Sequence, residues 1–222
     1  MYKACIFDLD GTLTDTLESL TYSVNKTLEE LGQPSITSEQ CESFVGNGAK
    51  VLIEKSLRAV GDEKLELLDK AMEAYGRIFG ANCTYQVEPY RGVRELLEGL
   101  TQKGVKLAVL SNKPHAQTVH VVKEIFGSDL FAYTQGQCEE IPRKPDPAGI
   151  YHIAQKLQIN PEECVYIGDS EVDIKTGLAA KVKTIGVTWG FRSKEILKDA
   201  GATNTVDNPQ NILDVISEEE NI

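Results

Sequence analysis

Short, uninterrupted apolar runs alternate along the chain with longer segments of helical periodicity. Four of these runs end abruptly in a polar or glycine-containing turn, at residues 4–7, 105–110, 164–167 and 182–187. Runs of this length without alternating polar positions are typical of strands that are buried on both faces of a parallel sheet. Weaker strand candidates are residues 130–134 and 205–206.

Between these runs, apolar residues recur at the three- and four-residue spacing of amphipathic helices. We expect the first such helix to open at Pro89 and close at Gly104, and the second to end at Gly127. Alternation of strands and helices predicts an α/β fold with a doubly wound, Rossmann-like parallel sheet. The apolar faces of three helices comprise Val93, Leu96, Leu97 and Leu100; Ala116, Val119, Val122 and Phe126; and Ile150, Ile153 and Leu157.

Residues 15–84 have helical periodicity throughout and no strand-like run. Their apolar stripes follow the first predicted strand, and we expect the third stripe to end at Gly80. The block is either a small, all-helical cap domain or a layer that covers one face of the sheet. If it is a cap, residues 1–14 and 85–222 form the α/β core domain. The stripes are Leu17, Leu20, Val24, Leu28 and Leu31; Ala49, Leu52, Ile53, Leu57 and Val60; and Leu65, Leu68, Met72, Tyr75 and Phe79.

Composition and charge narrow the classes of function. The 222 residues are 41% hydrophobic and 26% charged, which suits a globular protein with one good core or two unequal ones. The net charge of −11 opposes binding to nucleic acid or to an anionic membrane surface. No apolar window approaches the roughly 18 residues of a membrane-spanning helix, and no signal-peptide pattern is present. The five irregularly spaced cysteines indicate reduced thiols and a cytoplasmic location.

Polar residues follow directly on three of the predicted strands. Ligands bind beyond the carboxyl ends of the strands in an open parallel sheet, so these residues are the candidates for chemistry. Clustered carboxylates repel one another unless a cation compensates, and Mg²⁺ prefers such oxygen ligands. Serine side chains and backbone N–H groups at the same strand ends can bind a phosphate. The candidates are Asp8 and Asp10, Ser111 and Asn112, Asp169 and Asp173, and Lys144 in a proline-rich loop.

Four short motifs resemble the signatures of the haloacid dehalogenase-like hydrolase superfamily. The first is Phe7-Asp8-Leu9-Asp10-Gly11-Thr12-Leu13, and the second is Ser111-Asn112. The third is Lys144 with Pro145-Asp146-Pro147, and the fourth is Gly168-Asp169-Ser170-Glu171-Val172-Asp173. All four occur in the family order, so the resemblance covers the whole chain and favours the cap over the covering layer.

The resemblance implies a role for each acidic residue and for Lys144. Asp8 would be the nucleophile that takes the phosphoryl group, and Asp10 would protonate the leaving group and then activate water. Lys144 would offset the negative charge. Asp8 and Asp169 would bind Mg²⁺ through their side chains and Asp10 through its carbonyl, while Asp173 would hold a metal-bound water or the lysine.

The same resemblance supplies candidates for substrate binding. Thr12, Ser111 and the backbone of Asn112 would hold phosphoryl oxygens. The segment around Gly46-Asn47-Gly48-Ala49-Lys50 is similar to the cap of phosphoglycolate phosphatases, and Gly190-Phe191-Arg192-Ser193 also resembles that subfamily. Lys50 and Arg192 are therefore predicted substrate contacts, although a solvated charge is the plainer interpretation of each.

The aspartate at position 10 favours particular branches of the family. Dehalogenases lack an acid there and ion-pumping ATPases carry threonine, so Asp10 indicates a phosphatase or a phosphomutase. The preferred prediction is hydrolysis of 2-phosphoglycolate by a monomer or homodimer. The alternatives are a β-phosphoglucomutase-like enzyme, a pyrophosphatase or nucleotidase, and a binding protein without turnover.

Overall fold

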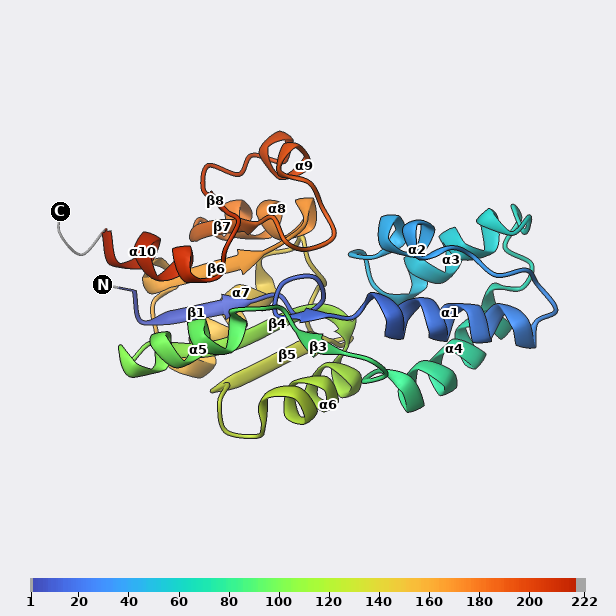
Figure 1. Cartoon of the computed structure of the whole chain (residues 1–222), viewed down its shortest axis with the longest axis horizontal. Helices are drawn as coiled ribbons and strands as arrows, with labels where there is room; N and C mark the ends of the chain where they lie inside the picture. Colours follow the sequence, from blue (N-terminus) through green and yellow to red (C-terminus); the bar gives the residue numbers. More distant parts are fainter. Residues whose placement is uncertain (1, 219–222) are drawn as a thin grey trace.

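Six parallel strands form one sheet in the computed structural model, which describes residues 2–218 (Figure 1). Their order is β5-β4-β1-β6-β7-β8, so the chain winds outward from β1 in both directions. This is the doubly wound α/β sheet that the sequence predicts. The strands are β1 (Ala4–Phe7), β4 (Lys106–Pro114), β5 (Tyr133–Gln137), β6 (Cys164–Gly168), β7 (Lys183–Val187) and β8 (Thr205–Val206).

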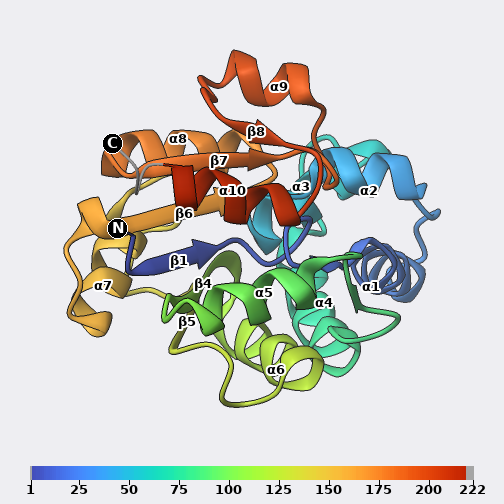
Figure 2. The same cartoon turned by 60° about the vertical axis from the view of Figure 1, so that its left-hand side comes forward.

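The central strand β1 is buried on both faces, which explains its unbroken apolar run. Cys5 and Phe7 pack into one hydrophobic core, and Ala4 and Ile6 pack into a second core on the opposite face. On the first face lie α5 (Val93–Gln102), α6 (His115–Phe126) and α10 (Gln210–Glu218), of which Figure 2 shows α5 and α10 side by side. The second face is covered by α7 (Ala148–Leu157) and α8 (Glu171–Ala180).

Several predicted boundaries were wrong. Strand β4 runs four residues beyond 110 and therefore contains Ser111 and Asn112. Strand β5 begins at Tyr133, three residues later than expected. Helix α5 does not open at Pro89, because Gly92 adopts a left-handed φ of 88° directly before Val93 and the chain turns there. Helix α6 ends before Gly127 as predicted, also at a positive φ.

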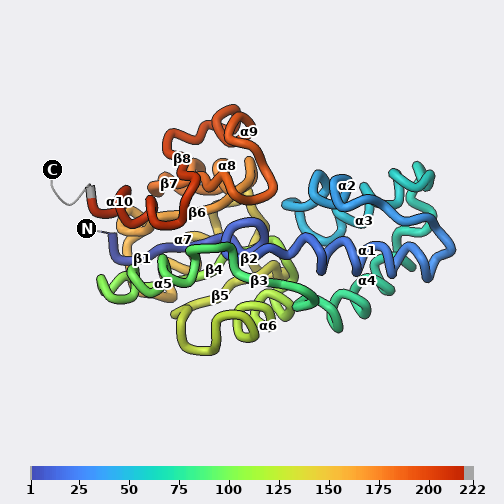
Figure 3. The backbone as a smooth tube through the Cα atoms, viewed as in Figure 1, coloured from blue at the N-terminus to red at the C-terminus, as the bar shows by residue number. Residues whose placement is uncertain are grey.

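Four helices lie beyond the carboxyl ends of the strands and not over a face of the sheet (Figures 1 and 3). They are α1 (Leu17–Glu30), α2 (Ser38–Phe44), α3 (Ala49–Ala59) and α4 (Leu68–Asn82), which passes the expected end at Gly80. This position agrees with a cap and not with a covering layer. The domain boundaries at residues 14/15 and 84/85 stay predictions.

A small two-stranded antiparallel sheet forms both connections between the helical block and the core. Strand β2 (Thr14–Asp15) pairs with β3 (Glu88–Pro89), so the chain leaves the core and returns to it at adjacent points. Pro89 therefore belongs to this strand pair and not to the following helix. The remaining short elements are η1 (Pro161–Glu163) and α9 (Lys194–Asp199). No helix within residues 2–218 is long and apolar enough to cross a membrane.

Candidate active site

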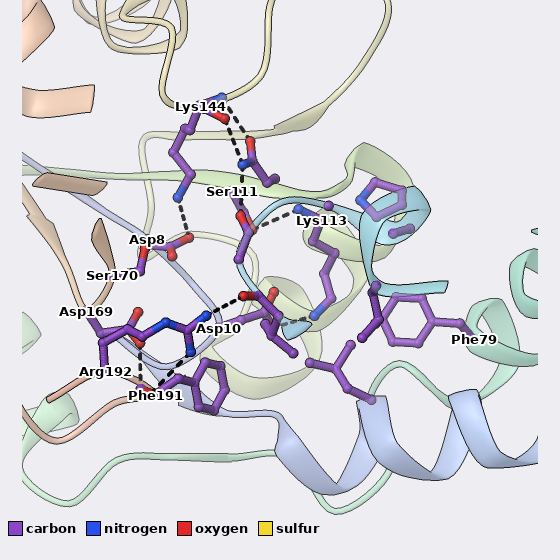
Figure 4. Close-up of a pocket in the computed structure, with 18 of the residues that line it drawn as sticks. Asp8, Asp10, Phe79, Ser111, Lys113, Lys144, Asp169, Ser170, Phe191 and Arg192 are labelled. Atoms are coloured by element: carbon purple, nitrogen blue, oxygen red, sulfur yellow. Dashed lines mark hydrogen bonds and ion pairs between the residues drawn. The ribbon is translucent and has the colours of Figure 1, made fainter. Parts of the chain in front are cut away.

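The ends of β1, β4 and β6 bring predicted site residues from three parts of the sequence into one pocket (Figure 4). Asp8 and Asp10 follow β1, Ser111 lies in β4, and Asp169 follows β6. Lys144 reaches the same pocket from the loop before α7. The walls above these polar groups come from α1, α3 and α4, so the pocket lies between the sheet and the four helices.

Lys144 is the cation at the centre of the carboxylate cluster. Its buried ammonium lies 2.8 Å from Asp8 Oδ1 and 2.7 Å from Asp173 Oδ1. The backbone of Lys144 is fixed by the Asn112 side chain, whose Oδ1 accepts from the Lys144 N–H (2.9 Å) and whose amide donates to the Lys144 carbonyl (3.1 Å). Asn112 therefore positions the lysine, a function of its side chain that the sequence did not indicate.

Asp173 is held as a carboxylate by hydrogen bonds to both of its oxygens. Tyr166 Oη donates to Oδ1 (2.8 Å), and the Ser170 hydroxyl and N–H donate to Oδ2 (2.6 and 3.1 Å). Burial acts to raise the pKa of Asp173, but Lys144 and these hydrogen bonds outweigh it and lower the pKa overall. The Asp173 carboxylate thus forms an ion pair with Lys144 and accepts hydrogen bonds from Tyr166 and Ser170. We conclude that Asp173 holds Lys144 in place.

Asp169 sits against two glycines that leave no room for a side chain. A Cβ at Gly11 would lie 2.3 Å from Asp169 Oδ2, and one at Gly190 would lie 2.1 Å from the Gly11 carbonyl. The Phe191 N–H donates to Oδ2 (2.8 Å), and the Thr12 hydroxyl donates to Oδ1 (3.1 Å). Thr12 was predicted to hold phosphoryl oxygens, but its hydroxyl is directed at Asp169 instead.

The carboxylates fit a divalent cation. One oxygen from each of Asp8, Asp169 and Asp173 lies within 4.8 Å of the others, and all three residues are buried. Burial, followed by repulsion from neighbouring carboxylates, raises the pKa of Asp8 well above its usual range and that of Asp169 to about 7. Among the described contacts, the Lys144 ammonium pairs with Asp8 and Asp173, so the cluster can accept a further cation, and carboxylate oxygens are the donors that Mg²⁺ prefers.

The raised pKa of Asp169 predicts a pH-dependent gain in stability for Asp169→Asn in metal-free protein. A carboxyl whose pKa is higher in the folded state stabilises the fold below about pH 4, and this contribution is lost as the pH rises towards 7. The shift corresponds to roughly 4 kcal/mol at high pH, from which weaker hydrogen bonds to the amide subtract about 1–2 kcal/mol. Urea unfolding in EDTA should show the variant more stable at pH 8 and the difference shrinking by pH 5. A variant less stable than wild type at pH 8 would contradict the prediction.

Lys113 is a buried site residue that the sequence did not indicate. Its ammonium forms an ion pair with Asp10, and Phe79 places its ring centroid 5.1 Å away. The backbone N–H of Lys113 donates a hydrogen bond to the Ser111 hydroxyl (3.1 Å). The predicted end of the strand at residue 110 placed Lys113 in a turn, whereas β4 carries it into the pocket.

The two predicted substrate contacts, Arg192 and Lys50, differ in their positions relative to the pocket. Arg192 lines the pocket, but its guanidinium contacts Glu171 (3.2 Å) and donates to the carbonyls of Glu42 (2.9 Å) and Val45 (2.7 Å). It therefore fastens the C-terminal end of α2 to the core. Lys50 lies outside the pocket on an outer face of α3, where 66% of its side chain is exposed and the nearest acid is Glu54 at 3.9 Å.

The loop that contains the glycine-rich segment closes the pocket. Two more side chains of the core hold it by its backbone: Asn112 donates to the Gly46 carbonyl (3.0 Å) and Arg143 donates to the Asn47 carbonyl (2.9 Å). Gly46 and Gly48 both have positive φ values, which lets the loop turn over the site. The loop contributes backbone and not a lysine to the wall of the pocket.

Comparison with known families decides the class to which this site belongs. The model of the haloacid dehalogenase-like hydrolase family matches residues 5–187, which is most of the chain. The chain belongs to this family. The matched region of this haloacid dehalogenase-like hydrolase contains all four motifs, from Asp8 to Asp173.

Individual relatives of this haloacid dehalogenase-like hydrolase are phosphatases by name. The phosphoglycolate phosphatase of Haemophilus influenzae is 32% identical over 97% of this chain and 98% of its own. Phosphoglycolate phosphatase 1 of Pseudomonas aeruginosa is 31% identical over 95% of this chain and 78% of its own. A crystal structure of a predicted phosphoglycolate phosphatase from Haemophilus somnus matches with a TM-score of 0.89 and 26% identity, covering 97% and 98% of the two chains. The predicted enzyme class, a phosphoric monoester hydrolase, is confirmed.

Proposed function

We propose that this hydrolase is a magnesium-dependent phosphatase that cleaves 2-phosphoglycolate through an aspartyl-phosphate on Asp8. The observation that carries the proposal is the position of Asp8 at the end of β1, in the pocket between Lys144 and Asp169. Asp10 lies in the same pocket, two residues further on. The named relatives support the substrate, because both are phosphoglycolate phosphatases and match at least 95% of this chain.

Each step assigns one task to a residue of the chain. The Asp8 carboxylate attacks phosphorus, and the bond from phosphorus to the leaving oxygen breaks. Asp10 donates a proton to that oxygen and then takes a proton from the water that hydrolyses the aspartyl-phosphate. Lys144, fixed by Asp173 and Asn112, offsets the charge that collects between Asp8 and the phosphoryl oxygens. Ser111 lines the same pocket and can donate to a phosphoryl oxygen.

The carboxylates of Asp8 and Asp169 and the carbonyl of Asp10 would hold Mg²⁺. Bound there, the ion would neutralise negative charge between the nucleophile and the phosphate. Thr12 and the Phe191 N–H fix the direction of Asp169, and Asp173 holds Lys144 in place. Assembly as a monomer or homodimer and a cytoplasmic location stay predictions from the sequence.

Release of inorganic phosphate from a panel of esters tests the proposal. We expect 2-phosphoglycolate to give the highest kcat/KM, with activity lost in EDTA and restored by Mg²⁺. The panel should include pyrophosphate, a nucleoside monophosphate and β-glucose 1-phosphate, which represent the alternative activities. Conversion of β-glucose 1-phosphate to the 6-phosphate would favour a phosphomutase, and no turnover of any ester would favour a binding protein.

Asp10→Asn should slow both half-reactions. An amide can neither protonate the leaving oxygen nor deprotonate water, so we expect kcat to fall by about 10²–10⁴-fold. The loss in kcat/KM, which reports transfer of the phosphoryl group to Asp8, should be smaller for p-nitrophenyl phosphate, because its leaving group departs without a proton. Steady-state kinetics on this ester and on 2-phosphoglycolate measure the difference. Equal losses on both esters would argue against Asp10 as the acid, and an unchanged rate would remove it from the mechanism.

A further inference from the structure

Lys113 presents a buried positive charge to the pocket beside the position of the leaving group. Only 2% of its side chain is exposed. Its ammonium contacts the carboxylate of Asp10 from one side and the ring of Phe79 from another. Figure 4 shows the side chain extending from β4 toward Asp10, away from Asp8 and Lys144. A lysine in this position costs desolvation energy, so its charge needs a partner inside the pocket.

The other basic side chains of the pocket already have full sets of partners. Within residues 2–218, the lining includes three such side chains: Lys113, Lys144 and Arg192. Lys144 is shared between two carboxylates, and Arg192 is bound to Glu171 and to two backbone carbonyls. Lys113 differs from both because its partner, Asp10, is the residue that has to turn to the substrate during the reaction.

The wall around Lys113 contains little else that could bind a polar leaving group. The helices α1, α3 and α4, together with Val45 directly after α2, contribute mainly apolar and aromatic side chains. In such surroundings, a charge pair is stronger than in water, while an unpaired anion is strongly disfavoured. An anionic group on the substrate would therefore have Lys113 as its partner. The residues of this wall are Leu20, Val45, Leu52, Tyr75 and Phe79.

The distance suits an anion one carbon away from the ester oxygen. Under the proposed function, Asp10 hydrogen-bonds the leaving oxygen, and Lys113 contacts Asp10 Oδ1. If Oδ1 makes both contacts, the ammonium lies within about 6 Å of that oxygen, the sum of two contacts of about 3 Å. In 2-phosphoglycolate, the carboxylate oxygens lie about 3 Å from the ester oxygen, given bond lengths of about 1.5 Å. A carboxylate placed there reaches the ammonium directly.

We propose that Lys113 is the specificity-determining residue, which selects phosphate monoesters with a second anionic group one carbon from the ester oxygen. When such an ester binds, Lys113 exchanges the carboxylate of Asp10 for the anion of the substrate. An ester with a neutral leaving group leaves Lys113 paired with Asp10 and gains nothing from the lysine. This inference rests on the proposed function and identifies the residue behind its substrate preference.

A pair of esters that differ only in charge tests the inference. We take the ratio of kcat/KM for 2-phosphoglycolate to that for 2-hydroxyethyl phosphate, in which a neutral CH₂OH group replaces the carboxylate. For wild type we expect a ratio of about 10² or more, because the site pairs one anion and rejects its neutral analogue. For Lys113→Met the ratio should fall to about 1 or below, because the anion of the substrate then has no cationic partner. General damage to the catalytic groups slows both esters and cancels in the ratio.

Two further variants separate charge from structure. Lys113→Arg keeps the charge and should retain at least part of the preference. Lys123→Met removes an exposed lysine on α6 and should keep the wild-type ratio. If Lys113→Met does not fold, as judged by circular dichroism, Lys113→Gln takes its place. A neutral variant that keeps the wild-type ratio, or a wild-type ratio near 1, overturns the inference while leaving the phosphatase proposal intact.

Binding measurements separate this inference from the proposed function. If wild type hydrolyses neither ester, the proposed function fails, and calorimetric titration of both esters in the presence of Mg²⁺ then tests Lys113 alone. Tighter binding of 2-phosphoglycolate to wild type, lost in Lys113→Met, would support the inference without turnover. Equal binding of the two esters to wild type, or an equal preference in both proteins, would overturn it.

Discussion

Asp8→Asn should abolish phosphate release, lowering kcat by at least about 10⁴-fold, while the protein remains folded. The amide has no negative charge with which to attack phosphorus, and no other described carboxylate takes its place. Asp169 is turned toward Thr12 and Phe191, and Asp173 is bound to Lys144, Tyr166 and Ser170. Phosphate release from 2-phosphoglycolate at saturating Mg²⁺ measures the loss.

The same substitution should not destabilise metal-free protein. Burial raises the pKa of Asp8, so the folded state disfavours its charge, and the neutral amide removes that cost. The hydrogen bond from the Leu9 N–H to Oδ1 can be kept by the amide oxygen. Asp199→Asn, on the exposed side of α9, is the matched control and should retain full activity. Activity within tenfold of wild type in a folded Asp8→Asn variant would rule out the covalent mechanism.

The sheet could be predicted because its central strands are buried on both faces. Burial on both faces removes polar positions, so Ala4–Phe7 and Cys164–Gly168 are recognisable without any knowledge of their neighbours. The rule that ligands bind at the carboxyl ends of parallel strands then joins Asp8 to Asp169, although 160 positions lie between them in the chain. Local pattern and topology together were enough to place the carboxylate cluster.

The extension of β4 could not be predicted, because its last residues are polar and buried. Ser111, Asn112 and Lys113 are all less than 7% exposed, and the side chains of Asn112 and Lys113 have partners in distant segments. Asn112 bonds to the loop of Lys144, and Lys113 pairs with Asp10, 103 positions earlier. A polar run reads as a turn until those partners are known, so the strand was ended too early and Lys113 was missed.

The roles of Thr12 and Arg192 were also beyond the sequence, for a related reason. Each side chain has several possible hydrogen-bond partners. The family resemblance suggested the substrate as the partner of both. In the structure Thr12 donates to Asp169, and Arg192 donates to backbone carbonyls at the C-terminal end of α2. The Thr12 bond depends on how the ends of β1 and β6 meet, and the Arg192 bonds depend on how the helical block packs on the core; no local pattern specifies either.

Lys144→Met should destabilise metal-free protein by about 3–5 kcal/mol at pH 8 and remove activity, because it leaves the buried carboxylates of Asp8 and Asp173 without their cation. In wild type, Lys144 keeps the pKa of Asp173 below its ordinary value, and this contribution to stability is present above about pH 4. Without the ammonium, both carboxyls should take up protons on folding. The deficit of the variant in urea unfolding should therefore shrink as the pH falls from 8 to 5.

A second substitution distinguishes loss of charge balance from loss of packing. If the unpaired carboxylates cause the deficit, Asp173→Asn added to Lys144→Met should recover part of the stability, although Asp173→Asn alone should destabilise wild type. If the missing aliphatic stem of Lys144 causes the deficit, the stability losses of the two single variants should add in the double variant. Lys123→Met controls for removal of a lysine as such, since its side chain is exposed. Additive losses, with a deficit equal at pH 5 and pH 8, would show that Lys144 contributes by packing alone, and would remove the electrostatic basis for its place in the mechanism.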